Sequence, residues 1–166
     1  MPPRIWIYGL LLSIMAGAAH AVDRQLPGRV VRVIDGDSLV LDVRGSHYHV
    51  ELTDIDAPEL NQPWGQAAAD WLHQSLTGSF VVVHNSGTVE DHHIRGRLIS
   101  RNRDIGLELL YEGLAWCTLR AVTEFPNQGR HYREAEVEAR QARRGLWLDE
   151  HAVPPWEWRR QGSPYD

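Results

Sequence analysis

The chain has 166 residues, a formal net charge of −5, and a composition of 43% hydrophobic and 23% charged residues. This composition is typical of a globular protein with a hydrophobic core and argues against a disordered chain. The length fits one domain with small additions. The negative charge argues against a generally basic surface, so a nucleic-acid ligand would need a local positive patch. Cys117 is the only cysteine, which excludes an internal disulfide.

The N-terminal segment has the pattern of a secretory signal peptide. Arg4 precedes an apolar run, and Ala19-His20-Ala21 places a small residue on each side of position 20. The run is shorter than the roughly 20 residues of a membrane-spanning helix, which favours cleavage over a retained anchor. We therefore expect residues 1–21 to be a signal peptide and the remaining chain to be exported, periplasmic or secreted, without a membrane segment.

Short β-rich stretches separated by turn sequences dominate the next part of the chain. Asp35-Gly36-Asp37 and Gly45-Ser46 have the chemistry of tight turns. Strands joined this closely form an antiparallel meander. In chain order, we expect strands over residues 29–34, 38–44, 48–55 and 80–83, then a polar loop over 84–96. Residues 97–100 and 103–105 are expected to form either a very short hairpin or the fifth strand.

Apolar residues at helical spacing after the third strand predict a helix that ends before Gly78. Asn61 is expected to cap this helix, and Pro63 lies where a first turn tolerates proline. Farther along, we expect helices over residues 107–111 and 132–144, an extended segment over 114–118 and a loop over 126–129.

The order of these elements predicts the fold class. Five strands with a helix after the third are typical of an OB-fold barrel. We therefore expect a mainly β fold with helices, of the α+β class, in which about three helices accompany a five-stranded barrel. Residues 22–150 form this domain, and residues 151–166 form a tail rich in proline and tryptophan.

Three carboxylates are expected to meet at one end of the meander. Asp37 lies in the turn after the first strand, while Asp56 and Glu59 follow the third strand, which returns beside that turn. Clustered carboxylates need a cation or an arginine to neutralise them, and their oxygens are ligands for hard divalent cations. Each motif alone is as typical of an ordinary turn, but the two motifs on either side of a hairpin indicate a metal site.

These motifs resemble those of the thermonuclease family, whose members contain a staphylococcal-nuclease-like domain. The similarity begins with the run from Gly28 to Glu59, which contains both motifs. It continues in the same order over nearly the whole chain after residue 21, in the segments 62–68, 96–99, 107–109, 113–116, 135–136, 143–147 and 154–159. The resemblance implies a nuclease that cleaves DNA and RNA and uses Ca²⁺ or another divalent cation.

The resemblance also implies roles for individual residues. Asp37 and Asp56 match the carboxylates that bind the cation, and Ala57 matches the residue that offers it a backbone carbonyl. Glu59 matches the general base that activates the attacking water. Arg97 matches the arginine that binds the phosphate and stabilises the charge that develops on it.

One position departs from the family pattern in a way that affects catalysis. Active members carry an arginine five residues before the metal-binding aspartate, and this chain has Glu51 there. Loss of one such donor costs about 10²–10³ in rate, and a carboxylate adds repulsion of the phosphate. Arg32, Arg44 and Arg95 are candidates to replace the missing arginine.

The second phosphate-binding arginine has two possible assignments. Arg97 follows a glycine and precedes an apolar strand, as in the family. Arg95 also fits the family spacing, because Asp91 lies four residues before it. We predict Arg97 and keep Arg95 as the alternative.

Two further residue types have more than one interpretation. His47 and His49 share one strand face, and His92 and His93 lie in the predicted loop. These histidines can form a transition-metal site, but scattered surface histidines are favoured, because no cysteine or third histidine has metal-ligand spacing. Tryptophans of the second half can stack on bases, but packing against the barrel is favoured: Trp116, Trp147, Trp156 and Trp158. Cys117 is expected in the core.

The leading hypothesis is an exported, monomeric, divalent-cation-dependent nuclease that hydrolyses phosphodiester bonds of DNA, with RNA as a further candidate substrate. The alternative, which Glu51 keeps open, is an OB-fold module with impaired catalysis that binds nucleic acid. A protein-interaction module would fit the acidic net charge but would leave the acidic cluster and Arg97 without a role.

Overall fold

The computed structural model describes residues 24–85, 91–124 and 126–162. The predicted signal peptide therefore lies outside the described residues, as does the end of the predicted tail, residues 163–166. Within the described ranges, no helix has both the length and the apolar character needed to cross a membrane.

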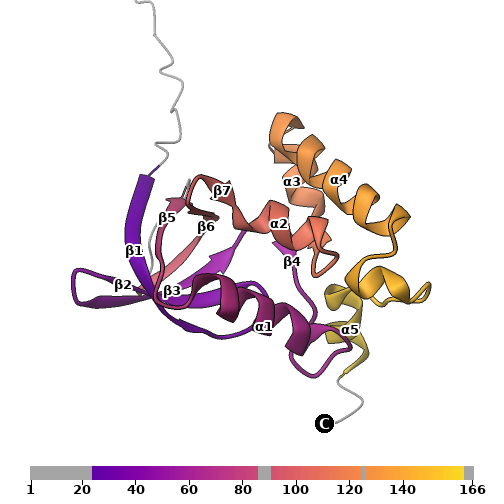
Figure 1. The fold of residues 1–166 in the computed structure, drawn as a ribbon, viewed down its shortest axis with the longest axis horizontal. Coiled ribbons are helices and arrows are strands. Elements are labelled where there is room, and N and C mark those ends of the chain that lie inside the picture. Colours follow the sequence, from indigo (N-terminus) through magenta and orange to yellow (C-terminus); the bar gives the residue numbers. More distant parts are fainter. Residues whose placement is uncertain (1–23, 86–90, 125, 163–166) are drawn as a thin grey trace, which may run out of the picture.

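Five strands curl into a closed barrel on one side of the molecule (Figure 1). They are β1 (Arg24–Val33), β2 (Ser38–Val43), β3 (Ser46–Leu52), β5 (Phe80–Asn85) and β6 (His93–Ser100). Neighbours in the order β3-β2-β1-β5-β6 pair in antiparallel fashion, and β3 pairs in parallel with β6 to close the sheet. A short strand, β7 (Arg103–Asp104), pairs with the end of β6. This arrangement confirms the predicted five-stranded OB-fold barrel.

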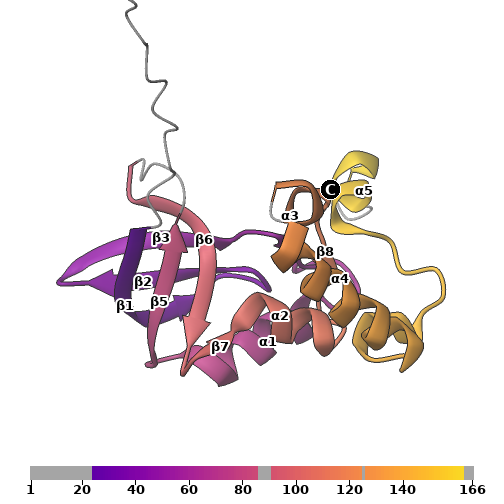
Figure 2. The same ribbon diagram turned by 90° about the horizontal axis from the view of Figure 1, so that it is seen from above.

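The helices gather below the barrel and beyond one of its ends (Figure 2). The first is α1 (Gly65–Leu76), which contacts β1, and the next three pack together as α2 (Ile105–Tyr111), α3 (Leu119–Glu124) and α4 (Pro126–Gln141). A 3₁₀ helix, η1 (Gly145–Leu148), and the last helix, α5 (Pro155–Gln161), follow. Two short strands, β4 (Ile55–Asp56) and β8 (Trp116–Cys117), pair with each other between the barrel and the helices.

One hydrophobic core joins the barrel to the helices. Along β6, the buried residues Ile94 and Leu98 alternate with exposed positions such as Arg95, as expected for a strand with one face inward. The largest fully buried side chains come from the barrel, α1, α2 and α4, and include Leu39, Leu41, Leu72, Leu76, Ile94, Leu98, Leu109 and Tyr132. Each such side chain contributes about 1.5–3 kcal/mol on burial, so the core stabilises a fold that has no disulfide.

Helix α1 begins later than the sequence predicts. It starts at Gly65, and the preceding residue, Trp64, adopts a left-handed conformation with φ of 72° and provides no side-chain cap. A Cβ atom at Gly65 would overlap the carbonyl oxygen of Glu59, so this tight turn requires glycine. The predicted cap is wrong, because Asn61 instead accepts a hydrogen bond from the indole of Trp158.

Several other segments also differ from the prediction. Residues 93–96, expected in a loop, form the start of β6 because they pair with β3 where the barrel closes. Residues 126–129, expected as a loop, form the beginning of α4. Since α3 and α5 add to the expected helices, the described part of the chain has five α-helices rather than about three. These elements depend on contacts between distant segments, which local sequence patterns do not reveal.

Candidate active site

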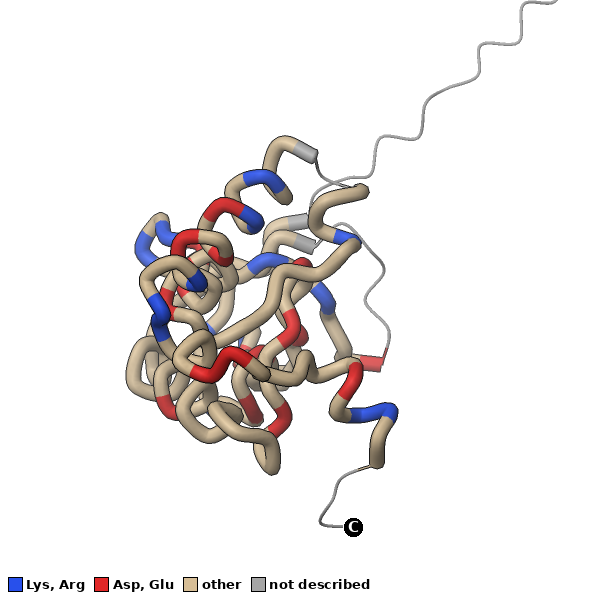
Figure 3. The backbone as a smooth tube through the Cα atoms, turned by 90° about the vertical axis from the view of Figure 1, so that its right-hand side faces the viewer, with Lys and Arg blue, Asp and Glu red and all other residues tan. Residues whose placement is uncertain are grey.

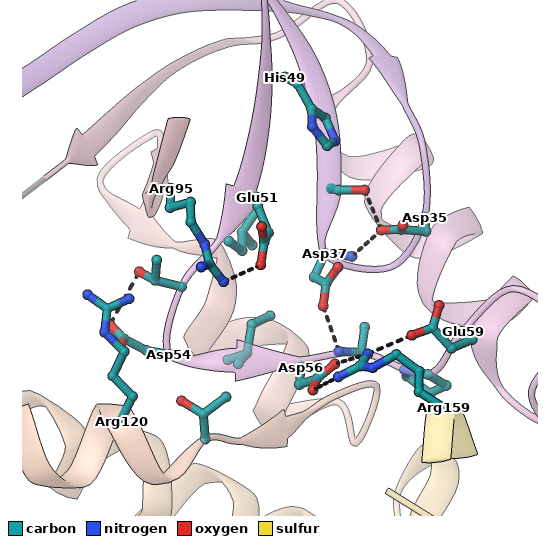
Figure 4. Close-up of a pocket in the computed structure, with 17 residues that line it drawn as sticks. Asp35, Asp37, His49, Glu51, Asp54, Asp56, Glu59, Arg95, Arg120 and Arg159 are labelled. Atoms are coloured by element: carbon teal, nitrogen blue, oxygen red, sulfur yellow. Dashed lines mark hydrogen bonds and ion pairs between the residues drawn. The ribbon is translucent and has the colours of Figure 1, made fainter. Parts of the chain in front are cut away.

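A cavity of about 470 Å³ lies where the barrel meets the C-terminal helices. It is lined by the turn between β1 and β2, by strand β3, by the segment from Thr53 to Glu59, and by single residues of β6, α3 and α5 (Figure 4). The meander brings the first two of these together, since the Leu52 N–H donates a 2.8 Å hydrogen bond to the Asp37 carbonyl. The turn that carries Asp37 therefore lies beside the end of β3, as the sequence predicts.

Asp37 is half-buried at the inner end of this cavity. Its Oδ2 accepts a 2.8 Å hydrogen bond from the Ala57 N–H, which ties the turn to the segment after β3. Asp35 holds the turn itself, because its Oδ1 accepts bonds from the Asp37 N–H and the Ser38 hydroxyl. Burial, together with the nearby carboxylates of Asp35 and Asp56, raises the pKa of Asp37 to about 8. An ionised Asp37 therefore needs a positive partner.

Asp56 and Glu59 share one positive partner, Arg159 of α5 (Figure 4). The guanidinium donates from Nη2 to Asp56 Oδ2 at 2.8 Å, from Nη1 to Asp56 Oδ1 at 3.2 Å, and from Nη1 to Glu59 Oε1 at 2.6 Å. Burial raises the pKa of Asp56, and Arg159 opposes that shift. The two carboxylates thus point at the same position in space, which a cationic group occupies.

Glu51 lies on β3 and faces Arg95 on β6. The parallel register of these strands places the two residues directly opposite each other. Arg95 donates a hydrogen bond to Glu51, and both side chains remain substantially exposed to solvent. The cavity therefore contains an arginine close to the position where the family's arginine is missing, but a carboxylate partly neutralises it.

Arg97, the arginine that we predict to bind phosphate, does not line the cavity. It lies in the middle of β6, where Nη1 contacts Asp104 Oδ2 at 3.4 Å. Asp104 also accepts the hydroxyl hydrogen of Tyr132 and caps α2 through the Leu107 N–H. Arg97 is thus part of a network between the barrel and the helices, whereas Arg95 lines the cavity.

Of the residues predicted for the site, the structure brings five around the cavity: Asp37, Asp56, Ala57, Glu59 and Arg95. The other candidates to replace the missing arginine, Arg32 and Arg44, are not among the cavity-lining residues of the described chain. Two arginines of the lining were not predicted, Arg120 and Arg159. Arg159 contacts a carboxylate 103 positions away in sequence, so only its place in the family-like segment 154–159 could have pointed to it.

The carboxylate oxygens of Asp37 and Asp56 are of the atom type that a hard divalent cation prefers as a ligand. Within the described residues, no three His, Cys, Asp or Glu side chains are arranged so that they would hold a metal ion by themselves. Any cation at Asp37 and Asp56 would therefore complete its coordination with backbone carbonyl, water or substrate oxygens, as cations bound by only one or two carboxylates do.

The histidines, tryptophans and cysteine have structural contacts of their own. His49 and His93 contact each other through their Nδ1 atoms at 2.8 Å, and His92 contacts the His47 carbonyl. Trp116 and Trp147 pack edge to face with ring centroids 5.3 Å apart, whereas Trp156 is partly exposed. Cys117 is buried in the core, as expected, and burial raises its pKa to about 11.

Along the backbone tube of Figure 3, the positions of arginines are interspersed with those of aspartates and glutamates. No long basic segment runs along the described part of the backbone, in agreement with the negative net charge of the chain. Binding of a polyanion at the cavity therefore depends on its individual arginines and on any bound cation.

Comparison with known proteins identifies the family. The sequence model described as "Staphylococcal nuclease homologue" matches residues 49–149. "Protein ParB" of Escherichia coli is 34% identical over 93% of this chain and 89% of its own length. "Micrococcal nuclease" of Shigella flexneri is 34% identical over 91% of this chain and 87% of its own length. An "Uncharacterized endonuclease" of Escherichia coli O157:H7 is 34% identical over 90% of this chain and 94% of its own length.

The extent of these matches places the chain in the staphylococcal nuclease homologue family. It is accordingly a nuclease, and its substrate is a nucleic acid. The OB-fold barrel and the position of the cavity at one end of that barrel agree with this assignment.

Proposed function

We propose that this protein is an exported nuclease that uses a divalent cation, Ca²⁺ in the first place, to hydrolyse phosphodiester bonds of DNA, with RNA as a second substrate. The observation that carries the proposal is the convergence of Asp37, Asp56, Glu59 and Arg95 on one open cavity. Export is supported by the signal-peptide pattern of residues 1–21. We further propose that the enzyme acts as a monomer.

The carboxylates of Asp37 and Asp56 would hold the cation, together with the backbone carbonyl of Ala57. The bound cation supplies a Lewis acid that polarises a phosphoryl oxygen. The chain contributes the orientation of these ligands, because the Ala57 N–H fixes Asp37 and the pairing of β4 with β8 fixes the backbone at Asp56. Because these ligands are fixed, a phosphate bound to the cation would have a defined position relative to Glu59 and Arg95.

Glu59 orients the attacking water and accepts its proton. Its backbone N–H donates to Gln62 Oε1 at 3.2 Å, and Gln62 is buried, so the main chain that carries Glu59 is held in place. Arg95, which is exposed at the rim of the same cavity, donates hydrogen bonds to the phosphate and stabilises the negative charge that grows in the transition state.

Cleavage of a labelled single-stranded DNA oligonucleotide tests this proposal. We expect cleavage with Ca²⁺, none with a chelator, and a loss of at least about 10²-fold for Glu59→Ala, since it removes the general base. The matched control is Glu112→Ala, an exposed glutamate at the end of α2, which should leave the rate unchanged. If purified protein cuts neither DNA nor RNA with any divalent cation, the proposal is wrong.

A second candidate function has one observation in its favour, the ion pair between Glu51 and Arg95. A carboxylate at this position weakens an arginine that the reaction needs, so the chain would bind nucleic acid and hydrolyse it poorly or not at all. Oligonucleotide binding without cleavage over many hours would support this alternative.

A further inference from the structure

The C-terminal helix places an arginine inside the cavity. Arg159 reaches from α5 to a position between Asp56 and Glu59, where it forms hydrogen bonds with both carboxylates (Figure 4). These are the two groups that, on the proposed function, bind the cation and hold the attacking water. A phosphate that contacts both the cation and this water must lie within a few ångströms of them, and therefore within reach of Arg159.

The position of α5 is fixed by contacts that form no part of the cavity. The Trp158 indole donates to Asn61 Oδ1 at 3.2 Å, and Gln62 Nε2 donates to the Val153 carbonyl at 2.6 Å. Pro155, in the first turn of α5, is buried. The helix is thus docked on the same loop, between β4 and α1, that carries Glu59, and these contacts hold Arg159 next to that carboxylate.

The excess of carboxyl groups in the cavity makes Arg159 important for the binding of a phosphate. Six carboxylates and only three guanidinium groups line the cavity in the described chain: Asp35, Asp37, Glu51, Asp54, Asp56 and Glu59 against Arg95, Arg120 and Arg159. Glu51 pairs with Arg95 and reduces its attraction for a phosphate. Without Arg159, the carboxyl groups of the lining would outnumber its guanidinium groups by three to one, which disfavours a nucleic acid unless the cation compensates.

We propose that Arg159 is a catalytic residue of this nuclease, which binds the substrate phosphate and supplies the positive charge that strand β3 lacks because of Glu51. This inference rests on the proposed function. In the absence of substrate, Arg159 neutralises Asp56 and Glu59. When the substrate is bound, its planar guanidinium contacts the phosphate, for which two parallel N–H donors are well suited. The missing arginine is thus replaced from the other end of the chain.

The test compares wild type with Arg159→Ala, Arg159→Lys and the control Arg160→Ala. Arg160 is the next residue of α5, its side chain is 73% exposed, and it contacts Trp156 and Glu157 of the same helix. Three quantities are measured: kcat/KM for single-stranded DNA, the calorimetric affinity for Ca²⁺ alone, and the calorimetric affinity for thymidine 5′-monophosphate in saturating Ca²⁺. The nucleotide carries a phosphate but no diester bond to cleave.

For Arg159→Ala, we expect kcat/KM to fall by about 10²–10³-fold. The affinity for the nucleotide should fall by about tenfold or more, because charge-assisted hydrogen bonds are lost. The affinity for Ca²⁺ should stay constant or rise, since a competing positive charge is removed. Arg159→Lys should keep part of the kcat/KM and part of the nucleotide affinity that Arg159→Ala loses, because lysine retains the positive charge but not the two parallel N–H donors of arginine. Arg160→Ala should match wild type in all three measurements.

Other outcomes overturn the inference. If Arg159→Ala raises both kcat/KM and the Ca²⁺ affinity while the nucleotide affinity is unchanged, Arg159 is an inhibitory latch on the cation site. If activity falls together with the melting temperature and the nucleotide affinity does not change, the residue only holds α5 in place. If wild type cleaves no nucleic acid, the proposed function fails, but the nucleotide measurement still decides whether Arg159 binds phosphate.

Discussion

Replacement of Glu51 by glutamine tests how charge is distributed in the cavity. The change keeps the size of the side chain and an oxygen that accepts the hydrogen bond from Arg95, and it removes one negative charge. The ion pair is exposed, with 67% and 46% of the two side chains accessible, so its loss should cost less than about 1 kcal/mol of stability. Any large change in activity would then reflect charge rather than unfolding.

The size of the effect follows from Coulomb's law. For illustration, two unit charges separated by about 7 Å interact with about 0.6 kcal/mol in bulk water and with about 2.4 kcal/mol at an effective dielectric constant of about 20. Glu51 is roughly half exposed, so the value lies near the lower limit, or about three- to tenfold in an equilibrium constant. The charge of Glu51 does reach the site, because it adds to burial in raising the pKa of Asp56.

DNA and Ca²⁺ carry opposite charges, so Glu51→Gln should strengthen the binding of DNA and weaken the binding of Ca²⁺. We expect KM for DNA to fall by about three- to tenfold in saturating Ca²⁺, and the Ca²⁺ concentration for half-maximal activity to rise by a similar factor. Both changes should shrink as NaCl increases from about 50 to 500 mM. Glu150→Gln, which breaks an exposed pair with Arg143 that is not part of the cavity, is the matched control.

A fall in kcat/KM for Glu51→Gln would refute this reasoning. It would mean that the charge of Glu51, and not merely its oxygen, keeps Arg95 in position. A decrease in KM that persists unchanged at high salt would also contradict an electrostatic cause, since screening must weaken it.

Three further predictions separate structural from catalytic roles. Arg95→Ala should lower kcat/KM by about 10²-fold, whereas Arg97→Ala should leave it within threefold and lower the free energy of unfolding by about 1 kcal/mol, as measured by activity assays and urea titration. Asp37→Asn should abolish cleavage but raise the free energy of unfolding in chelator by about 1–2 kcal/mol, because a half-buried carboxylate beside other carboxylates is removed. The buried Cys117 thiol, whose pKa is raised to about 11, should react with a thiol reagent at pH 8 about 100-fold more slowly in the folded than in the urea-unfolded protein. Its rate should rise with pH up to about 11, since only the thiolate reacts; rapid labelling of folded protein at pH 8 would contradict its burial.

The barrel and its acidic cluster could be predicted because they depend on neighbours in sequence. Strands β1, β2 and β3 are joined by tight turns, so the return of Asp56 and Glu59 to Asp37 follows from strand lengths and turn chemistry alone. Helix α4 could be predicted in large part for the same reason, since its apolar spacing is local.

The cap of α1, the beginning of β6 and the helix in the C-terminal tail could not be predicted in this way. Trp64 adopts a left-handed conformation because Gly65 must approach the Glu59 backbone closely, which is a tertiary constraint. Residues 93–96 read as a polar loop because their outward side chains are polar, and only pairing with β3 makes them a strand. In the tail, α5 owes its position to Gln62 and Asn61 of a distant loop.

The sequence by itself determined the order of the strands, the presence of three carboxylates at one end of the barrel, and the departure from the family at Glu51. Only the tertiary structure decided which arginines accompany those carboxylates. The parallel register of β3 with β6 puts Arg95 opposite Glu51 and leaves Arg97 beside Asp104, and the docking of α5 brings Arg159 to Asp56 across 103 positions. Spacing along a chain can specify neighbours within a hairpin, but the direction of a side chain across a barrel depends on pairing between segments that are far apart in sequence.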